Sequence, residues 1–129
     1  MCGIVGYVGK KPVVDILLDG LEQLEYRGYD SSGIAIKTAT SIDVYKAEGK
    51  LANLRDVLRP NTDKITQSTM GIGHIRWATH GAPTVLNAHP HTCNCGNLVV
   101  VHNGIIENYK ELRSELEADG CTFRSQTDT

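Results

Sequence analysis

Residues 2–28 read CGIVGYVGKKPVVDILLDGLEQLEYRG and contain the clearest structural pattern in the chain. Residues 3–8 predict a short strand, in which Ile4 and Val5 anchor the N-terminus in a sheet. Pro12 then opens a helix that ends near Gly28. Its apolar residues fall on one helical stripe: Val14, Leu17, Leu18, Leu21 and Leu24. The start of the chain therefore predicts a strand that is followed by an amphipathic helix.

The rest of the chain mixes short strands with short helices, which is typical of an α+β fold. The predicted strands are 32–37, 41–46, 71–78, 97–102 and 121–124, the predicted helices are 49–60 and 109–120, and 59–69 is a polar surface loop. The strands 32–37 and 41–46 are separated by only a few residues and predict a hairpin. The apolar run at 98–101 is typical of a strand covered on both faces. Because the chain stops soon after a new strand begins, we expect a fragment of a larger domain.

Composition excludes several classes of protein. The chain has 129 residues, 40% of them hydrophobic, and its formal charge is −2, which indicates one folded domain. The absence of a basic patch and the low aromatic content of 5% argue against nucleic-acid binding. The longest aliphatic run is too short to cross a membrane, and the first residues of the chain lack the pattern of a secretory signal. We therefore expect a cytoplasmic protein whose four cysteines are reduced thiols.

Cys2 is a candidate nucleophile. Removal of the initiator methionine would leave Cys2 as the N-terminal residue, with a thiol and a free α-amine on the same residue. The ordinary pKa of that amine, about 7.7 to 8.0, suits a general base near neutral pH. Without further signals, a cysteine at position 2 is more often an ordinary small residue than a nucleophile.

Five other positions carry groups that suit substrate binding. Arg76 and His80 come directly after the apolar GIGHI stretch at 71–75, where an arginine can grip a carboxylate and a histidine can act as a base or orient a group. Asn103 and Gly104 could donate an amide and a backbone N–H to an oxyanion. Asp128 could hold an ammonium group. The alternatives are a structural ion pair for Arg76, an ordinary turn at Asn103 and Gly104, and a loop carboxylate for Asp128.

A zinc site is the main competing hypothesis. His89, His91, Cys93 and Cys95 alternate in HPHTCNC and offer imidazole and thiolate ligands. On a straight strand, however, residues on the same face lie about 6.5 to 7 Å apart, too far for one ion to bind all four. A small zinc-binding module therefore requires a turn within this segment.

Six motifs occur in a fixed order along the chain. They are CGIVGYVG at 2–9, YRGYDSSG at 26–33, HIRWATHG at 74–81, NAHPH at 87–91, HNGIIEN at 102–108 and TDT at 127–129. Together they resemble the glutaminase domain (glutamine amidotransferase type 2) of the glucosamine-6-phosphate synthase family. The related glutamine phosphoribosylpyrophosphate amidotransferases typically differ where Tyr29 and Trp77 stand here.

The resemblance implies an N-terminal-nucleophile hydrolase fold, a four-layer αββα sandwich that is incomplete in 129 residues. It implies that Cys2 attacks the side-chain amide of L-glutamine, and that Asn103 and Gly104 form the oxyanion hole. The implied glutamine-binding residues are Arg76, Trp77, Thr79, His80 and Asp128, and Arg27 supports the N-terminal residue.

The resemblance also implies the setting of the reaction. In the complete family enzyme, which we expect to be a homodimer, ammonia passes Trp77 to an isomerase domain that holds fructose 6-phosphate. No metal and no organic cofactor are implied. The CNC segment at 93–95 is not part of the family signature, and a complete glutaminase domain continues beyond residue 129. We therefore expect unpaired edges and uncovered apolar faces in this chain.

Overall fold

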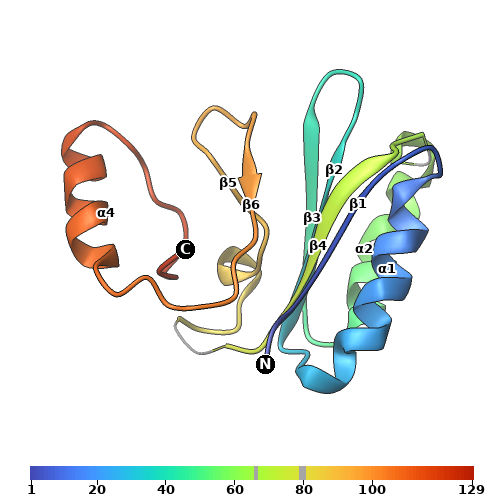
Figure 1. Cartoon of the computed structure of the whole chain (residues 1–129), viewed down its shortest axis with the longest axis horizontal. Helices are drawn as coiled ribbons and strands as arrows, with labels where there is room; N and C mark the ends of the chain where they lie inside the picture. Colours follow the sequence, from blue (N-terminus) through green and yellow to red (C-terminus); the bar gives the residue numbers. More distant parts are fainter. Residues whose placement is uncertain (66, 79–80) are drawn as a thin grey trace.

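The computed structural model describes residues 1–65, 67–78 and 81–129. Its main feature is a four-stranded antiparallel sheet in the order β1-β4-β2-β3. The strands are β1 (Gly3–Val8), β2 (Ser31–Lys37), β3 (Ile42–Glu48) and β4 (Met70–Arg76). The helices α1 (Val13–Leu24) and α2 (Leu51–Leu58) cover one face of this sheet (Figure 1).

The core lies between these helices and the sheet. In β4, a Cβ added at Gly71 or Gly73 would contact Leu17 or Leu21 of α1, so these positions face the helices. Directly opposed residues of an antiparallel pair share a face, which places Ile34 and Ile36 of β2 on the same side. The fully buried core is Val13, Leu17, Leu21, Ile34, Ile36, Leu54 and Ile75.

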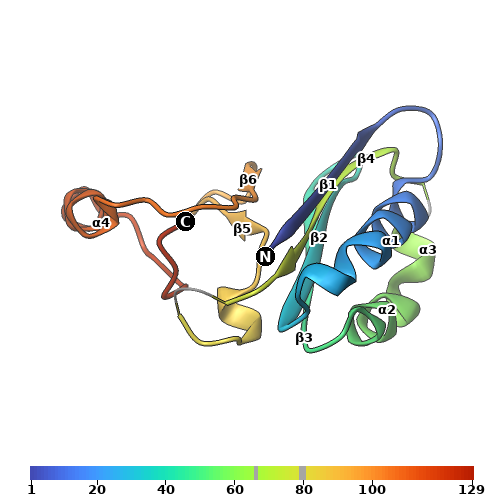
Figure 2. The same cartoon turned by 60° about the horizontal axis from the view of Figure 1, so that its bottom comes forward.

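The opposite face of the sheet carries the polar residues His74 and Arg76, and the second part of the chain lies on it. That part contains β5 (His91–Thr92), β6 (Val99–Val100) and α4 (Tyr109–Ala118). Figures 1 and 2 both show β5 and β6 on the side of the sheet away from α1, with α4 farther out. The 81–92 segment thus brings later residues to the end of β4.

Away from His74 and Arg76, much of the sheet face opposite the helices is apolar and open. A groove of about 430 Å³ separates the sheet from β6 and is lined by Val8, Met70, Ile72 and Val99. Val8 is 77% exposed, and Ile4 and Met70 are each more than 40% exposed. The expectation of uncovered apolar faces is confirmed for this chain.

Most of the predicted elements are confirmed, including the first strand, the 12–28 helix, the hairpin and the 71–78 strand. Within the described residues, three expectations are wrong. The 97–102 strand is reduced to β6, because its pairing is limited to the two residues of β5, and Leu98 just before it is 58% exposed. Residues 121–124 form no strand.

The third wrong expectation concerns the polar loop at 59–69. Short helical turns occupy Arg59–Asn61 and Thr62–Ile65 there, because Ile65 packs into the core and is only 3% exposed. The described part of the chain contains no helix that is long and apolar enough to span a membrane.

Candidate active site

Cys2 lies just before β1, beside the residue that follows β4. The Trp77 backbone N–H donates to Cys2 Sγ over 3.3 Å, and Sγ lies 3.5 Å from the Trp77 carbonyl oxygen. The β1–β4 register, which pairs Gly3 with Ile75, brings these two ends together. Cys2 is half-buried and not part of a disulfide. Its thiol is therefore held by backbone groups and remains reachable.

Arg27 and Gly28 lie beside this end of the chain. The Met1 amino group donates to the Arg27 carbonyl oxygen, and Arg27 Nη2 lies 3.8 Å from Met1 Sδ. Gly28 has a φ of +143° and packs against the Trp77 indole, where a Cβ would come within 2.6 Å of the ring. Only glycine combines this backbone conformation with this contact. The YRG segment thus surrounds the N-terminus.

Asp30 organises the 76–78 turn, a role that the sequence analysis did not assign. Its Oδ2 accepts a hydrogen bond from the Ala78 backbone N–H, and its own N–H donates to the Arg76 carbonyl over 3.1 Å. Ser31 Oγ donates to Oδ1 over 3.2 Å. Because these contacts set the backbone on both sides of Trp77, Asp30 indirectly positions the groups that hold Cys2.

Asn103 is attached to the centre of the sheet by His74. His74 Nε2 lies 2.7 Å from Asn103 Oδ1, and His74 is fully buried. Burial is the main reason that the pKa of His74 falls to about 4, although the hydrogen bond to Asn103 opposes the shift. His74 pairs with Ile4 in the β1–β4 register, so Asn103 is bonded to the strand residue that lies opposite the second residue after Cys2.

His89 and His91 extend a stack that begins at His74. The His74 and His89 rings are stacked with centroids 4.3 Å apart, and the His91 ring is tilted by 52° against His89 with centroids 4.5 Å apart. Burial lowers the pKa of His89 to about 2 and that of His91 to about 4. His89 Nδ1 accepts from the His102 N–H, and His91 Nε2 bonds Thr127 Oγ1. Uncharged rings therefore support the segment that carries Asn103.

The zinc hypothesis gains no support from this arrangement. Among the described residues, no three His, Cys, Asp or Glu side chains are grouped as metal ligands. The two histidines are packed against the sheet, whereas Cys93 and Cys95 lie in the turn between β5 and β6. The turn required by the hypothesis is present, but it does not bring the four ligands together.

Arg76 is buried at the end of β4 and holds the next segment of the chain. Nη1 donates to the Ala82 carbonyl over 2.9 Å, and Nη2 donates to the Gly81 carbonyl over 3.3 Å. Asn87 Nδ2 also donates to Ala82, and Asn87 Oδ1 accepts from the Gln126 N–H over 2.8 Å. Asn87, which the sequence analysis missed, thus joins this segment to the 126–129 end. The predicted residues Thr79 and His80 lie outside the described residues.

Asp128 and Gly104 lie in neighbouring segments of the same region. Asp128 Oδ2 accepts a hydrogen bond of 2.6 Å from the Ile106 N–H, two residues after Gly104. Gly104 has a φ of +155°, and a Cβ there would come within 2.8 Å of His102 Nε2. The structure thus brings Asn103, Gly104 and Asp128 together at one turn, and it connects that turn through His74 to the strand end beside Cys2.

Comparison with known proteins identifies the family. Residues 60–129 match the glutamine amidotransferase domain. The chain belongs to this glutamine amidotransferase family. Glutamine–fructose-6-phosphate aminotransferases (isomerizing) from Thermus thermophilus and Symbiobacterium thermophilum are 57% and 55% identical to it over 129 residues. The chain spans only 21% of the length of these curated relatives.

Solved structures of glutamine amidotransferases share the fold. A glutamine phosphoribosylpyrophosphate amidotransferase from B. subtilis, complexed with ADP and GMP, superposes with a TM-score of 0.78 at 26% identity. The match covers 100% of this chain and 27% of that chain. The amidotransferase domain here therefore has the N-terminal-nucleophile hydrolase fold, as predicted, in an incomplete form.

Asp30, Asn87 and His74 are the residues of this site that sequence reasoning missed. Each lies inside a quoted motif, YRGYDSSG, NAHPH or HIRWATHG, so the motif was the available signal. Asp30 and Asn87 act on backbone groups 48 and 39 residues away. Such long-range contacts leave no local pattern.

Proposed function

We propose that residues 1–129 are the N-terminal part of a glutaminase domain, which hydrolyses L-glutamine to glutamate and ammonia through a thioester on Cys2. The observation that carries the proposal is that the two groups are held by nearby positions of the chain: Trp77 contacts Cys2 Sγ through its backbone, and His74, three residues earlier, fixes the amide of Asn103. A reachable thiol and a positioned amide donor are the two groups that attack on a carboxamide requires.

The general base is the α-amine of Cys2 after removal of Met1. In the described chain the Cys2 nitrogen is a peptide amide, which is not basic, and the Met1 amine instead donates to Arg27. Removal of Met1 creates an amine beside the thiol and leaves the Arg27 carbonyl as a nearby acceptor. The amine takes the thiol proton as sulfur attacks the amide carbon and then transfers it to the departing ammonia. Water subsequently hydrolyses the thioester.

Asn103 and Gly104 supply the donors for the tetrahedral intermediate. His74 occupies Asn103 Oδ1, so that Nδ2 is left as a donor toward substrate. The positive φ of Gly104 sets the backbone at the turn. A preorganised donor of this kind is worth about 2.7–4 kcal/mol of transition-state stabilisation.

The two ends of glutamine are bound by opposite charges. Arg76 binds the α-carboxylate, supported by its place at the end of β4 and its contacts with the 81–82 backbone. Asp128 binds the α-ammonium group, supported by its position beside the Asn103–Gly104 turn. Thr79 and His80 cover the bound amino acid in this proposal, and Arg27 steadies the N-terminal residue.

We further propose that the full-length protein is a cytoplasmic homodimer that transfers ammonia to fructose 6-phosphate. Support comes from relatives that are named glutamine–fructose-6-phosphate aminotransferases. In this proposal Trp77 separates the glutaminase site from the ammonia path, supported by its backbone contact with Cys2 and its 54% exposure.

Two measurements on the full-length protein test the proposed function. Mass spectrometry should show an N-terminal cysteine, because retained Met1 removes the base and contradicts the mechanism. Cys2→Ala should lower ammonia release from glutamine by about 10³-fold or more. Its matched control, Cys93→Ser with Cys95→Ser, should retain turnover under reducing conditions. The reverse ranking would favour the zinc hypothesis.

A further inference from the structure

Cys93 and Cys95 lie together in the tight turn that joins β5 to β6. The Cys93 N–H donates to the Leu98 carbonyl, and the Gly96 N–H donates to the Cys93 carbonyl, each over 3.0 Å. The two sulfur atoms are 2.9 Å apart, and each also lies within hydrogen-bond distance of Asn97 Oδ1. The backbone of the turn therefore holds two thiols in contact.

The environment of this pair suits thiol chemistry rather than burial. Cys95 is exposed, Cys93 is partly exposed, and both are free. The hydrogen bond from Cys95 lowers the pKa of Cys93 to about 7, assisted by N–H groups of Asn97 and Leu98. A sizeable fraction of Cys93 is then thiolate at neutral pH, and thiolate is the reactive form.

We propose that Cys93 and Cys95 form a thiol–disulfide site, which a low-molecular-weight disulfide oxidises to an intramolecular bond across Asn94. This site is separate from the Cys2 chemistry and does not depend on the proposed glutaminase function. A neighbouring pair of thiols on an exposed turn is suited to reversible oxidation in a reducing compartment.

The reaction is a two-step exchange. Cys93 thiolate attacks one sulfur of the small disulfide, that S–S bond breaks, and the first small thiol leaves with the proton lost by Cys93. Cys95 then gives up its proton and attacks the Cys93 sulfur of the mixed disulfide, which releases the second small thiol. The protein loses two electrons and two protons, and one small disulfide becomes two thiols.

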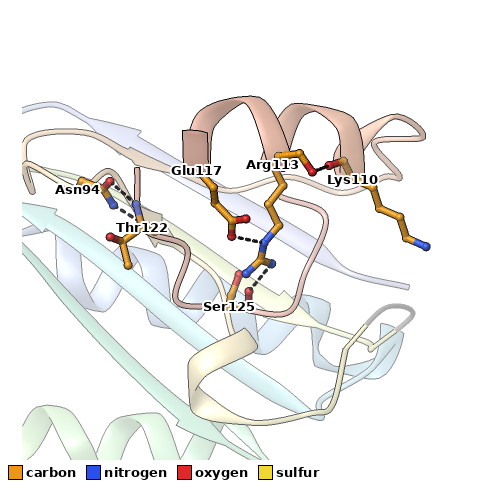
Figure 3. Close-up of polar contacts among 7 residues, drawn as sticks. Asn94, Lys110, Arg113, Glu117, Thr122 and Ser125 are labelled. Atoms are coloured by element: carbon orange, nitrogen blue, oxygen red, sulfur yellow. Dashed lines mark hydrogen bonds and ion pairs between the residues drawn. The ribbon is translucent and has the colours of Figure 1, made fainter. Parts of the chain in front are cut away.

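Asn94 connects this site to the far end of the chain. Its Oδ1 accepts from the Thr122 N–H over 2.9 Å, and its Nδ2 donates to the Thr122 carbonyl over 2.8 Å. Figure 3 shows both contacts, together with the bond from Arg113 to the Ser125 carbonyl, which ties α4 to the same segment, and the Arg113–Glu117 ion pair within α4. A bond between the residues on either side of Asn94 constrains its backbone, and we expect it to separate Asn94 from Thr122.

The test uses the full-length protein in a Cys2→Ala background, so that the candidate nucleophile does not react. Oxidised glutathione is added to reduced protein, and peptide mass spectrometry locates the products. We expect the peptide that contains both cysteines to lose two hydrogens, also in the Cys121→Ser control. With Cys93→Ser or Cys95→Ser, the remaining cysteine should keep one glutathione.

Three outcomes would overturn the proposal. They are glutathione retained on both cysteines, a disulfide from either cysteine to Cys121, and no oxidation at concentrations that modify an exposed thiol. Hydrogen exchange tests the link to Asn94. Exchange in residues 119–126 should rise on oxidation and stay unchanged in the Cys93→Ser variant. A disulfide that forms without this rise shows that Asn94 does not transmit the change.

Discussion

His74 Nε2 lies 2.7 Å from Asn103 Oδ1 and thereby joins the centre of β4 to the segment after β6. Because an amide oxygen only accepts hydrogen bonds, Nε2 carries the proton and the ring is a donor. Burial keeps this ring neutral at physiological pH, since it lowers the pKa of His74 to about 4. The orientation of the Asn103 amide thus depends on a buried, uncharged histidine.

Replacement of His74 by leucine should lower kcat for glutamine hydrolysis with little change in KM. Leucine fills much of the same volume but cannot hold Asn103 Oδ1, so the amide rotates away from the position of the oxyanion. Loss of an oxyanion donor costs about 10²–10³ in kcat, and misplacement should cost about 10-fold or more. Steady-state kinetics of the full-length protein measure both constants. A change confined to KM would contradict this role, whereas partial recovery in His74→Gln supports it.

The histidine stack should make the domain less stable in mild acid. Burial lowers the pKa of His74 and His91 to about 4, and that of His89 to about 2. The ordinary pKa of histidine is about 6.5, so below this pH the unfolded chain binds protons that the folded chain does not. The free energy of unfolding therefore falls as pH drops from about 6.5 to 4, by up to about 1.4 kcal/mol per pH unit for each ring.

Thermal unfolding between pH 7.5 and pH 5 measures this effect. The transition temperature of wild-type protein should fall across this range. His89→Phe should flatten the dependence, because it removes one titrating ring while keeping an aromatic group in the stack. Equal slopes for both proteins would show that His89 does not contribute.

Gly33→Ala should be strongly destabilising, whereas Gly6→Ala should not. A Cβ at Gly33 would lie 2.1 Å from the His89 carbonyl oxygen, a backbone atom that cannot move away alone. At Gly6 the nearest atom would be Ile72 Cγ2 at 3.9 Å, which is ordinary contact. We expect a cost of about 3 kcal/mol or more for Gly33→Ala and less than about 1 kcal/mol for Gly6→Ala. The urea midpoints of the two variants measure their stability. Similar losses of stability in Gly33→Ala and Gly6→Ala would argue against close packing of His89 on β2.

Asp30→Ala should lower kcat/KM for glutamine by about 10-fold or more, because the Ala78 N–H loses its acceptor and the turn beside Cys2 loosens. Asp30→Asn keeps one acceptor oxygen and should retain more activity. The rate at which iodoacetamide alkylates Cys2 gives a second measurement. An unchanged rate in Asp30→Ala would show that the turn does not depend on this carboxylate.

The 129-residue chain produced alone should bind a hydrophobic dye and aggregate. Val8, Ile4 and Met70 form an apolar surface on the open face of the sheet, and β1 is an edge strand. Val8→Lys should reduce both dye binding and aggregation. Cooperative unfolding of the wild-type chain together with glutaminase turnover would contradict this expectation.

The sequence predicts the first sheet and its helices well because those elements are local. The stripe from Val14 to Leu24 and the Leu51–Leu58 spacing each follow from periodicity within one segment. The strand order does not follow, since β4 inserts between β1 and β2 through long-range pairing. Residues 97–102 were overpredicted, because an apolar run indicates burial only when other elements cover it.

The candidate site divides in a similar way. Cys2, Arg76, Asn103 and Asp128 could be named from their chemistry and from the family resemblance. Their supporting residues could not, because Asp30 and Asn87 act on distant backbone groups and His74 acts on a side chain 29 residues away. Residue type alone carries no information about such partners.

The sheet order also affects the timing of maturation during synthesis. Among the described strands, β1 lies at the edge of the sheet and pairs with β4, which ends at Arg76. At about 5–20 residues per second, the ribosome takes on the order of 4–15 s to reach that residue. Throughout this interval the nascent N-terminus has no strand to pair with. An aminopeptidase can therefore trim the initiator residue before the sheet closes around it.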